Sequence, residues 1–348
     1  MPGEDVLTVS NLRVGFRGER GTVQAVDDVS FTLRRGEIVS IVGESGSGKS
    51  VSAMTLMGLT RGRSAQISGS AVLADGTDLL AAGDEQLRRI RGSRISMIFQ
   101  DPMSALTPVY RVGDQIVEQI RAHEKVTRAA ARARSVDLLR RVGIPRPAER
   151  VDDYPHQFSG GMRQRVMSAM ALSCSPEILI ADEPTTALDV TIQAQILAEI
   201  ERLRDEIGVS VLLITHDLGV VAEVASRVVV MYAGRVVEEA ELRPLFADPA
   251  HPYTWGLLGS VPRVDRERPD RLPTISGSPP SLLSPPSGCH FAPRCPHRFA
   301  PCTEQVPELA DRTGPGHADR CHLSVEDKRR LRVVDGGIGL PALSAVPS

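Results

Sequence analysis

Aromatic residues are scarce in this chain: Phe, Trp and Tyr make up 3% of its 348 residues. Platforms on which nucleic-acid bases stack are therefore not expected. An excess of positive charge is also missing, because the formal net charge is −2 and the sequence pI is about 6.5. A general nucleic-acid-binding protein is usually basic, so the composition predicts no nucleic-acid partner.

Long hydrophobic runs are missing as well. The longest ones, such as VSVLLIT and RVVVMYA, fall far below the roughly 20 apolar residues that a transmembrane helix needs. The stretch MPGEDVLTVS is acidic and has no apolar segment of the kind found in secretory signals. We therefore expect a cytosolic protein, in which paired disulfides are uncommon.

A glycine-rich loop is the first positive feature. The apolar stretch EIVSIVG indicates a strand that runs straight into GESGSGKS, and KSVSAMTLMGL then has apolar positions at helical spacing. The loop fits G-x-x-x-x-G-K-S, and strand, glycine loop and helix in this order are the context of a phosphate-binding loop, or P-loop. Gly43, Gly46 and Gly48 let the backbone curl so that successive N–H groups face one anion.

Side chains of the P-loop and of a second strand complete a nucleotide site. Lys49 supplies a charge for the β- and γ-phosphates, and the Ser50 hydroxyl can bind Mg²⁺. The apolar stretch EILIADE ends in Asp182, which can hold Mg²⁺, and Glu183, which is suited to polarise the attacking water. GTPases, small-molecule kinases and recombinases share the P-loop, so the remaining motifs must separate these classes.

Other segments show strand or helix patterns. VLTVSNLRVGF and VQAVDDVSFTL alternate as strands do, and RISMIFQ and VSVLLITHD are typical of buried strands. Hairpins are expected around Asp75-Gly76 and, with Gly234 at the turn, in RVVVMYAGRVVEEA. ARARSVDLLRRVGI is an amphipathic helical segment.

A second glycine-rich loop, FSGGMRQR at 158–165, opens a further apolar helical stretch. It resembles the signature loop, usually written LSGGQ, of ATP-binding-cassette (ABC) ATPases. Motifs of that family cover about residues 5–240 in the family's order. The chain departs from the pattern at Phe158, in place of leucine, and at Met162, in place of glutamine.

The resemblance implies an α/β fold, namely an ABC-type P-loop ATPase with a RecA-like core, an antiparallel β subdomain and an α-helical subdomain at about 101–157. It implies catalytic roles for Glu183, for the Q-loop residue Gln100 and for the switch residue His216. Mg²⁺ would be held by Ser50, Gln100 and Asp182. The residues that would bind nucleotide are Phe16, Gly43, Glu44, Ser45, Gly46, Ser47, Gly48, Lys49, Ser50, Val51, Ser159, Gly160, Gly161 and Asp189.

Two ATPase domains of this family pair head to tail. Ser159, Gly160 and Gly161 would therefore serve the ATP of the partner, since a hydroxyl, backbone amides and a helix N-terminus suit a γ-phosphate. Asp189, in the D-loop sequence ALD, would link the two sites across the interface, and Phe16 would stack on adenine.

The wording YPHQFSGGMRQRVMSAMAL, followed later by HPYTWGLLGSVP and a Pro-rich linker, resembles the ATPase subunits of bacterial oligopeptide and dipeptide importers up to about residue 324. This implies ATPase domain 1–245, C-terminal extension 246–330 and a disordered tail 331–348. The partners implied are two permease subunits, a second ABC ATPase and, indirectly, an external peptide-binding protein, with the chain peripheral at the cytoplasmic face of the membrane. Nickel or glutathione import, and a non-transport ABC ATPase, are the alternatives.

Four of the five cysteines gather in the extension, at Cys289, Cys295, Cys302 and Cys321. The resemblance points to a [4Fe–4S] cluster there. A zinc site is an alternative because histidines lie close by, although C-x₂₋₄-C spacing is missing, and unligated thiols or disulfides are others. Cys174, in an apolar helical stretch, is expected in the core.

Overall fold

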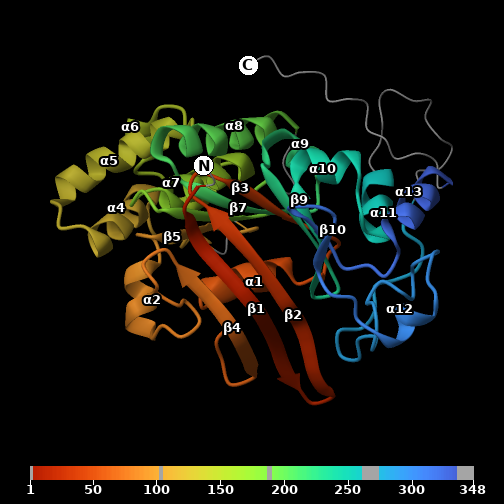
Figure 1. Cartoon of the computed structure of the whole chain (residues 1–348). Coiled ribbons are helices and arrows are strands. Elements are labelled where there is room, and N and C mark those ends of the chain that lie inside the picture. The colour runs from red at the N-terminus through yellow and green to blue at the C-terminus, as the bar shows by residue number, and fades with distance from the viewer. Residues whose placement is uncertain (1–2, 102–104, 186–189, 261–273, 335–348) are drawn as a thin grey trace.

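The computed structural model describes residues 3–101, 105–185, 190–260 and 274–334. Two β-sheets form its centre (Figure 1). The larger sheet has eight strands in the order β10-β11-β9-β8-β3-β7-β6-β5. In chain order these strands are β3 (Ile38–Val42), β5 (Ile95–Ile98), β6 (Ile178–Asp182), β7 (Ser210–Thr215), β8 (Arg227–Tyr232), β9 (Arg235–Glu241), β10 (Ala310–Gly314) and β11 (His317–Asp319).

The middle of this sheet is parallel, from β8 through β3, β7 and β6 to β5. Every residue of these five strands is buried, which explains their nearly continuous apolar sequences. Because the strands are parallel, their carboxyl ends lie along one edge, where ligands of open α/β sheets bind. β9 then turns back antiparallel through Ala233 and Gly234, whose φ angles are both positive, so the predicted hairpin is confirmed.

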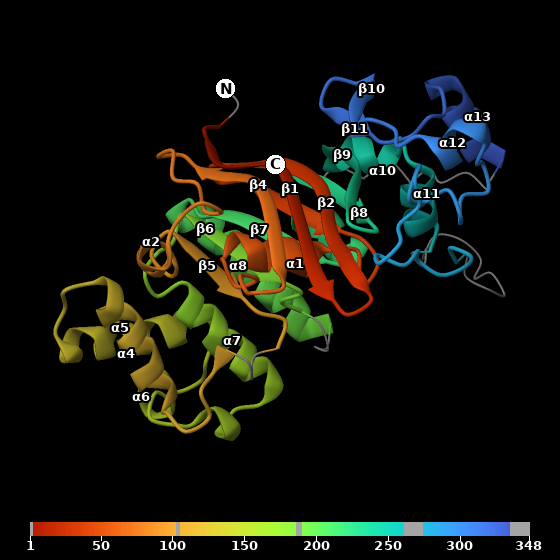
Figure 2. The same ribbon diagram turned by 90° about the horizontal axis from the view of Figure 1, so that it is seen from below.

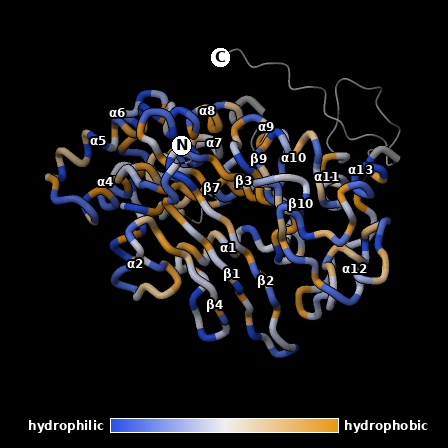
Figure 3. Tube along the Cα trace, in the orientation of Figure 1, coloured by the Kyte–Doolittle hydropathy of each residue, from blue (hydrophilic) through white to orange (hydrophobic). Residues whose placement is uncertain are grey.

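The smaller sheet is antiparallel and covers one face of the larger one (Figure 2). Its strands, in the order β2-β1-β4, are β1 (Asp5–Gly18), β2 (Gly21–Arg34) and β4 (Ala65–Leu73). Side chains of this sheet, of helix α1 (Lys49–Leu56) and of one face of the parallel strands form a single core. Figure 3 shows that the chain is hydrophobic along the central strands β3 and β7.

Helices cover the opposite face of the parallel strands. Met167, Ile200 and Val220 pack there, one from each of the helices α7 (Gly160–Ala171), α8 (Val190–Ile207) and α9 (Leu218–Val224). The predicted fold class is therefore confirmed: a RecA-like parallel sheet lies between helices and an antiparallel β subdomain.

A helical subdomain has a core of its own. Its helices are α4 (Val112–His123), α5 (Arg128–Arg141) and α6 (Pro147–Arg150), with a 3₁₀ turn at Pro155–Gln157; helix α2 (Asp84–Ile90) precedes β5. Ile116, Leu139 and Phe158 are buried in this core together with the start of α7. In Figures 1 and 2 the helical subdomain lies at the opposite end of the molecule from the described residues 274–334.

The C-terminal extension is joined to the ATPase sheet. Its helices are α10 (Leu242–Ala247), α11 (Pro252–Gly259), α12 (Ala300–Glu304) and α13 (Val325–Val334). Strand β11 pairs with β9, so residues of the extension form the last two strands of the large sheet. The fully buried Glu238 of β9 accepts hydrogen bonds from the Ala250 and His251 N–H groups and pairs with His317 Nε2 at 2.7 Å.

The small hairpin predicted around Asp75-Gly76 is confirmed: the Leu73 N–H donates to the Thr77 carbonyl at 2.9 Å, the Leu79 N–H donates to the Ala71 carbonyl at 2.8 Å, and Val72 and Asp78 form an antiparallel bridge. Two expectations need correction. Cys174 lies beyond the end of α7 and is half-buried rather than in the core. The tail predicted at 331–348 is helical as far as Val334, and residues 335–348 lie outside the described part. Among the described residues no helix is long and apolar enough to cross a membrane.

Candidate functional site

The P-loop follows β3 and leads into α1, as the sequence predicts. Gly43, Gly46 and Gly48 all have positive φ angles. A Cβ atom on Gly43 would lie 2.1 Å from the Met231 carbonyl oxygen, and one on Gly48 would lie 2.4 Å from the carbonyl oxygen of Ala25. A Cβ on Gly46 would meet no atom within 4 Å. Two of the three glycines are thus required by packing, whereas Gly46 faces open space.

This difference gives a first prediction. Gly43→Ala should lower the free energy of unfolding by about 3 kcal/mol or more, because the backbone of β8 must move to relieve the clash. Gly46→Ala should cost only about 1 kcal/mol of left-handed strain. Chemical unfolding of both variants without nucleotide measures the difference, and equal losses at the two positions would contradict this reading of the loop.

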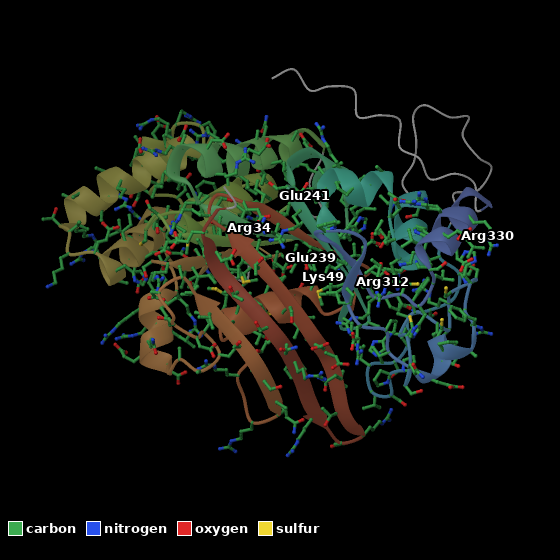
Figure 4. All side chains as sticks on the ribbon, viewed as in Figure 1. Arg34, Lys49, Glu239, Glu241, Arg312 and Arg330 are labelled. Atoms are coloured by element: carbon green, nitrogen blue, oxygen red, sulfur yellow. The ribbon has the colours of Figure 1, made fainter. Side chains whose placement is uncertain are left out.

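Lys49 is 4% exposed and folds back over the loop, near the middle of the molecule (Figure 4). Its Nζ donates to the Gly43 carbonyl at 2.7 Å and to the Glu44 carbonyl at 3.0 Å. Burial lowers the pKa of Lys49, while the nearby carboxylates of Glu183 and Asp182 oppose that change. The ammonium group is therefore held against the loop that would surround the phosphates.

Ser50 and Asp182 provide adjacent oxygen atoms from α1 and the end of β6. The Ser50 hydroxyl donates to Asp182 Oδ1 at 2.9 Å. Burial raises the pKa of Asp182, and the hydrogen bond from Ser50 opposes this change. A hydroxyl and a carboxylate beside a phosphate loop are oxygen ligands that suit Mg²⁺, so these two predicted ligands fit the ion.

The carboxylate of Glu183 receives a contact from each neighbouring strand end. Gln100 Nε2, after β5, donates to Glu183 Oε2 at 2.7 Å, and His216 Nδ1, after β7, lies 3.1 Å from Glu183 Oε1. Glu183 has a left-handed backbone (φ 46°), although its N–H still donates to the Ile214 carbonyl at 2.8 Å. A non-glycine residue in this conformation is costly, and such strain is concentrated at functional sites. The structure therefore brings together all three residues predicted to be catalytic.

Comparison with known proteins agrees with this geometry. The family model described as ABC transporter matches residues 26–186, and the model described as the oligopeptide/dipeptide transporter C-terminal region matches residues 237–302. The dipeptide transport ATP-binding protein DppD of Bacillus subtilis is 53% identical over 334 residues, which cover 96% of this chain and 98% of that protein.

The chain is a member of the ABC transporter ATP-binding family.

Other relatives support the same assignment. The oligopeptide transport ATP-binding protein OppD of Salmonella typhimurium is 50% identical over 328 residues, covering 94% of this chain and 96% of that protein. A dimeric ATP-binding cassette solved with ADP and Pi superposes with a TM-score of 0.62 at 27% identity, covering 68% of this chain and 99% of that one. This ABC chain is an ATPase.

The ABC signature loop lies at the start of α7. Ser159 is the N-cap residue of this helix, and its hydroxyl accepts from the Met162 N–H at 3.4 Å. Ser159 and Gly160 are exposed, whereas Phe158 is buried in the helical subdomain. Phe158 therefore replaces the family's leucine with another apolar side chain that packs in this core. Asp189, in the predicted D-loop, lies outside the described residues.

Other predicted nucleotide contacts differ in exposure. Phe16, near the end of β1, is half-buried and packs against the main core, as does Val51 of α1. Ser45 is exposed, and the buried Ser47 accepts from the Gly234 N–H at 3.0 Å. Whether Phe16 stacks on adenine stays a prediction.

Two contacts to the P-loop were missed by sequence reasoning. Arg294 pairs with the Glu44 carboxylate, and Tyr253 accepts a hydrogen bond from the Glu44 N–H. Neither residue belongs to a nucleotide-binding motif, and 250 positions separate Arg294 from Glu44. Only the fold brings them together.

The four cysteines of the extension converge on one small pocket. Cys289, Cys295, Cys302 and Cys321 line it together with His251, His297 and His322. None of the five cysteines, all of which lie in the described part of the chain, forms a disulfide, and burial raises the pKa of Cys289 and raises the pKa of Cys321 to about 12. Within the described residues there is no group of three or more His, Cys, Asp or Glu that could hold a metal ion.

Proposed function

We propose that this chain is an ATP-hydrolysing subunit that powers peptide import through a membrane permease. The observation that carries this proposal is the 53% identity, over nearly the whole chain, with a dipeptide transport ATP-binding protein. The match of residues 237–302 to the oligopeptide/dipeptide transporter region adds support, because it lies beyond residues 26–186, which match the ABC transporter model. The names of the relatives favour peptides over nickel or glutathione, and favour transport over the soluble ABC class.

The proposed mechanism places ATP in the P-loop. Lys49 and the loop N–H groups bind the phosphates, and Ser50, Asp182 and Gln100 would hold Mg²⁺, which would supply positive charge beside the β- and γ-phosphates. Glu183 takes a proton from the attacking water as the water oxygen bonds to the γ-phosphorus and the bond to the ADP oxygen breaks. Gln100 and His216 hold the Glu183 carboxylate in place, and His216 is positioned to contact the γ-phosphate.

A second ATPase completes the proposed site. Ser159, Gly160 and Gly161 face outward at a helix start, where they can bind the γ-phosphate of a partner's ATP. Asp189 would connect the two sites. The solved dimeric cassette supports a paired arrangement. A partner that is a different ABC subunit is our inference from the resemblance to the importer pair.

Permease binding is proposed at the groove between the core and the helical subdomain. The groove has a volume of about 930 Å³ and is lined in part by Met97, Phe99 and Met170. Beside the Q-loop, Val109 and Tyr110 are 72% and 59% exposed. Exposed apolar side chains next to a groove suit a protein contact. The chain would then lie peripherally at the cytoplasmic face of the membrane, with two permease subunits above it and a peptide-binding protein outside.

The test is ATP turnover by the complex in membranes. The chain is co-expressed with its genomic neighbours, and hydrolysis is measured with and without a short-peptide library and the binding protein. We expect peptides to stimulate turnover. ATP turnover that responds to nickel or glutathione instead of peptides would identify that compound as the cargo. ATP turnover without any co-purifying permease would overturn the transport role.

We also propose that the cysteine pocket holds a [4Fe–4S] cluster with a structural role. The proposal rests on the four thiols that line one pocket, because a [4Fe–4S] cluster takes four cysteine ligands. Zinc stays the alternative.

Metal analysis tests the pocket. The full chain, purified without oxygen, should contain about four iron and four sulfide per molecule and absorb visible light. Cys302→Ser should lose this iron, because Cys302 lines the pocket, whereas the matched variant Cys174→Ser should keep it. One zinc per chain would support the alternative, and neither metal in the wild type would show that the thiols are unligated.

A further inference from the structure

The P-loop is held from the side by the C-terminal extension. Arg294 Nη1 lies 2.8 Å from Glu44 Oε2, and Nη2 lies 3.2 Å from Glu44 Oε1, so the guanidinium binds the carboxylate with two parallel bonds. Only 5% of the Arg294 side chain is exposed. Its other hydrogen bonds reach the Tyr232 hydroxyl of β8 at 3.3 Å and the Ile275 and Ser276 carbonyls of the extension, so the guanidinium is held from both sides. A buried bidentate pair of this kind is among the stronger polar contacts.

The backbone of the same residue is held as well. The Glu44 N–H donates to the Tyr253 hydroxyl at 2.8 Å. Tyr253 is fully buried, and its ring packs against Tyr232 of β8 and Phe291 of the extension, at centroid distances of 4.6 and 5.5 Å. The hydroxyl therefore has little freedom to move, and the second residue of the loop is fixed through both its main chain and its side chain.

A third contact acts behind the loop. His290 Nδ1 donates to the Ala233 carbonyl at 2.8 Å, and the next residue, Gly234, donates its N–H to the Ser47 carbonyl at 3.0 Å. The β8–β9 turn thus lies between the extension and the P-loop. Two separate routes, through Glu44 and through this turn, connect the extension to the loop that binds phosphate.

The charge of Glu44 makes the first route matter for nucleotide binding. An unpaired carboxylate in a P-loop would repel the negative phosphates. Arg294 neutralises this carboxylate, and the Lys49 Nζ contacts the backbone carbonyl of Glu44. These contacts also order the loop before ATP binds, so ATP binding loses less conformational entropy and the affinity for ATP is higher.

We propose that Arg294 and Tyr253 are positioning residues for the P-loop, so that the C-terminal extension sets the ATP affinity of the cassette. This inference rests on the phosphate-binding role proposed above for the loop. Because Arg294 directly precedes Cys295, the arginine that holds the P-loop and the cysteine pocket belong to one segment of the extension.

The test compares matched arginine variants of the full chain. Arg294→Met removes the pair with Glu44, and Arg294→Lys keeps the charge but not the two parallel bonds. The control is Arg320→Met, because Arg320 also joins the extension to the cassette, through Asp28 at 3.2 Å, without touching the loop. Titration calorimetry measures the Kd of Mg-ADP and of a non-hydrolysable Mg-ATP analogue, and thermal unfolding without nucleotide measures stability.

We expect Arg294→Met to weaken nucleotide binding about five- to tenfold, at the low end of typical coupling between sites, since the other phosphate ligands stay in place. Arg294→Lys should recover part of the loss, and Arg320→Met should leave the Kd unchanged. In a Glu44→Gln background, Arg294→Met should have little further effect, because the arginine acts through Glu44. Tyr253→Phe should weaken binding in the same direction.

Two outcomes would overturn the inference. One is a wild-type Kd in Arg294→Met; the other is an equal change in Arg294→Met and Arg320→Met that follows their loss of thermal stability. If Arg294→Met does not fold, Arg294→Lys and Glu44→Gln supply the same comparison. Failure of the wild-type chain itself to bind nucleotide would instead refute the phosphate-binding role of the P-loop.

Discussion

Glu183→Gln should lower ATP turnover about 100-fold or more while ATP binding is retained, because the loss of a general base costs about 10²- to 10⁴-fold. The amide cannot accept the proton of the attacking water, yet it keeps the shape of the side chain. It can also still accept a hydrogen bond from Gln100 Nε2, as the carboxylate does at 2.7 Å. Single-turnover hydrolysis in the assembled complex and nucleotide titration measure the two effects separately.

The retained ATP should also hold the two ATPase subunits together. A site that closes around ATP opens when hydrolysis removes the γ-phosphate, so the variant should accumulate a nucleotide-bound pair in size-exclusion chromatography. The matched control is Glu223→Gln, on the exposed side of α9, which should turn over normally. Normal turnover by Glu183→Gln would remove Glu183 from the catalytic role.

Lys49→Ala should weaken ATP binding about 10- to 100-fold. A hydrogen bond to a charged group contributes roughly 1.5–3 kcal/mol, and each 1.4 kcal/mol is about a tenfold change in Kd. The variant loses the ammonium charge for the phosphates and also the bonds to the Gly43 and Glu44 carbonyls that shape the empty loop. Calorimetric titration with Mg-ATP measures the loss.

Lys49→Arg tests whether a positive charge alone is enough for ATP binding. Its side chain keeps the charge but is too large for the buried position of Lys49, so this variant should also bind ATP poorly. Lys125→Ala, at an exposed position between α4 and α5, is the control and should bind ATP as the wild type does. ATP affinity unchanged in Lys49→Ala would contradict the assignment of the P-loop.

The grouping of the residues proposed to be catalytic could be predicted, because the family resemblance, the order of the motifs and the sheet topology agree. Gln100, Glu183 and His216 each follow a buried apolar strand, and β5, β6 and β7 are neighbours in one parallel sheet. Parallel strands bring such residues to one edge. The order of the motifs along the chain was therefore enough to predict that Gln100 and His216 lie beside Glu183.

Contacts across long sequence separations could not be predicted in the same way. Two such contacts are the pairing of β11 with β9 and the ion pair between Arg294 and Glu44. Both depend on how the extension folds onto the cassette, which no periodic pattern in the sequence indicates. The small hairpin at Asp75-Gly76, by contrast, could be predicted, because its two arms are adjacent in the sequence.

The pairing of β11 with β9 has a consequence for synthesis on the ribosome. The cassette is translated first, and β9 then has an open edge until residues 317–319 emerge. An unpaired edge strand invites pairing with other chains, and the Glu238 carboxylate lacks its His317 partner during this interval. Nascent chains that stop before His317 should therefore bind chaperones or aggregate, and completion of the C-terminal residues is the step that covers this edge of β9.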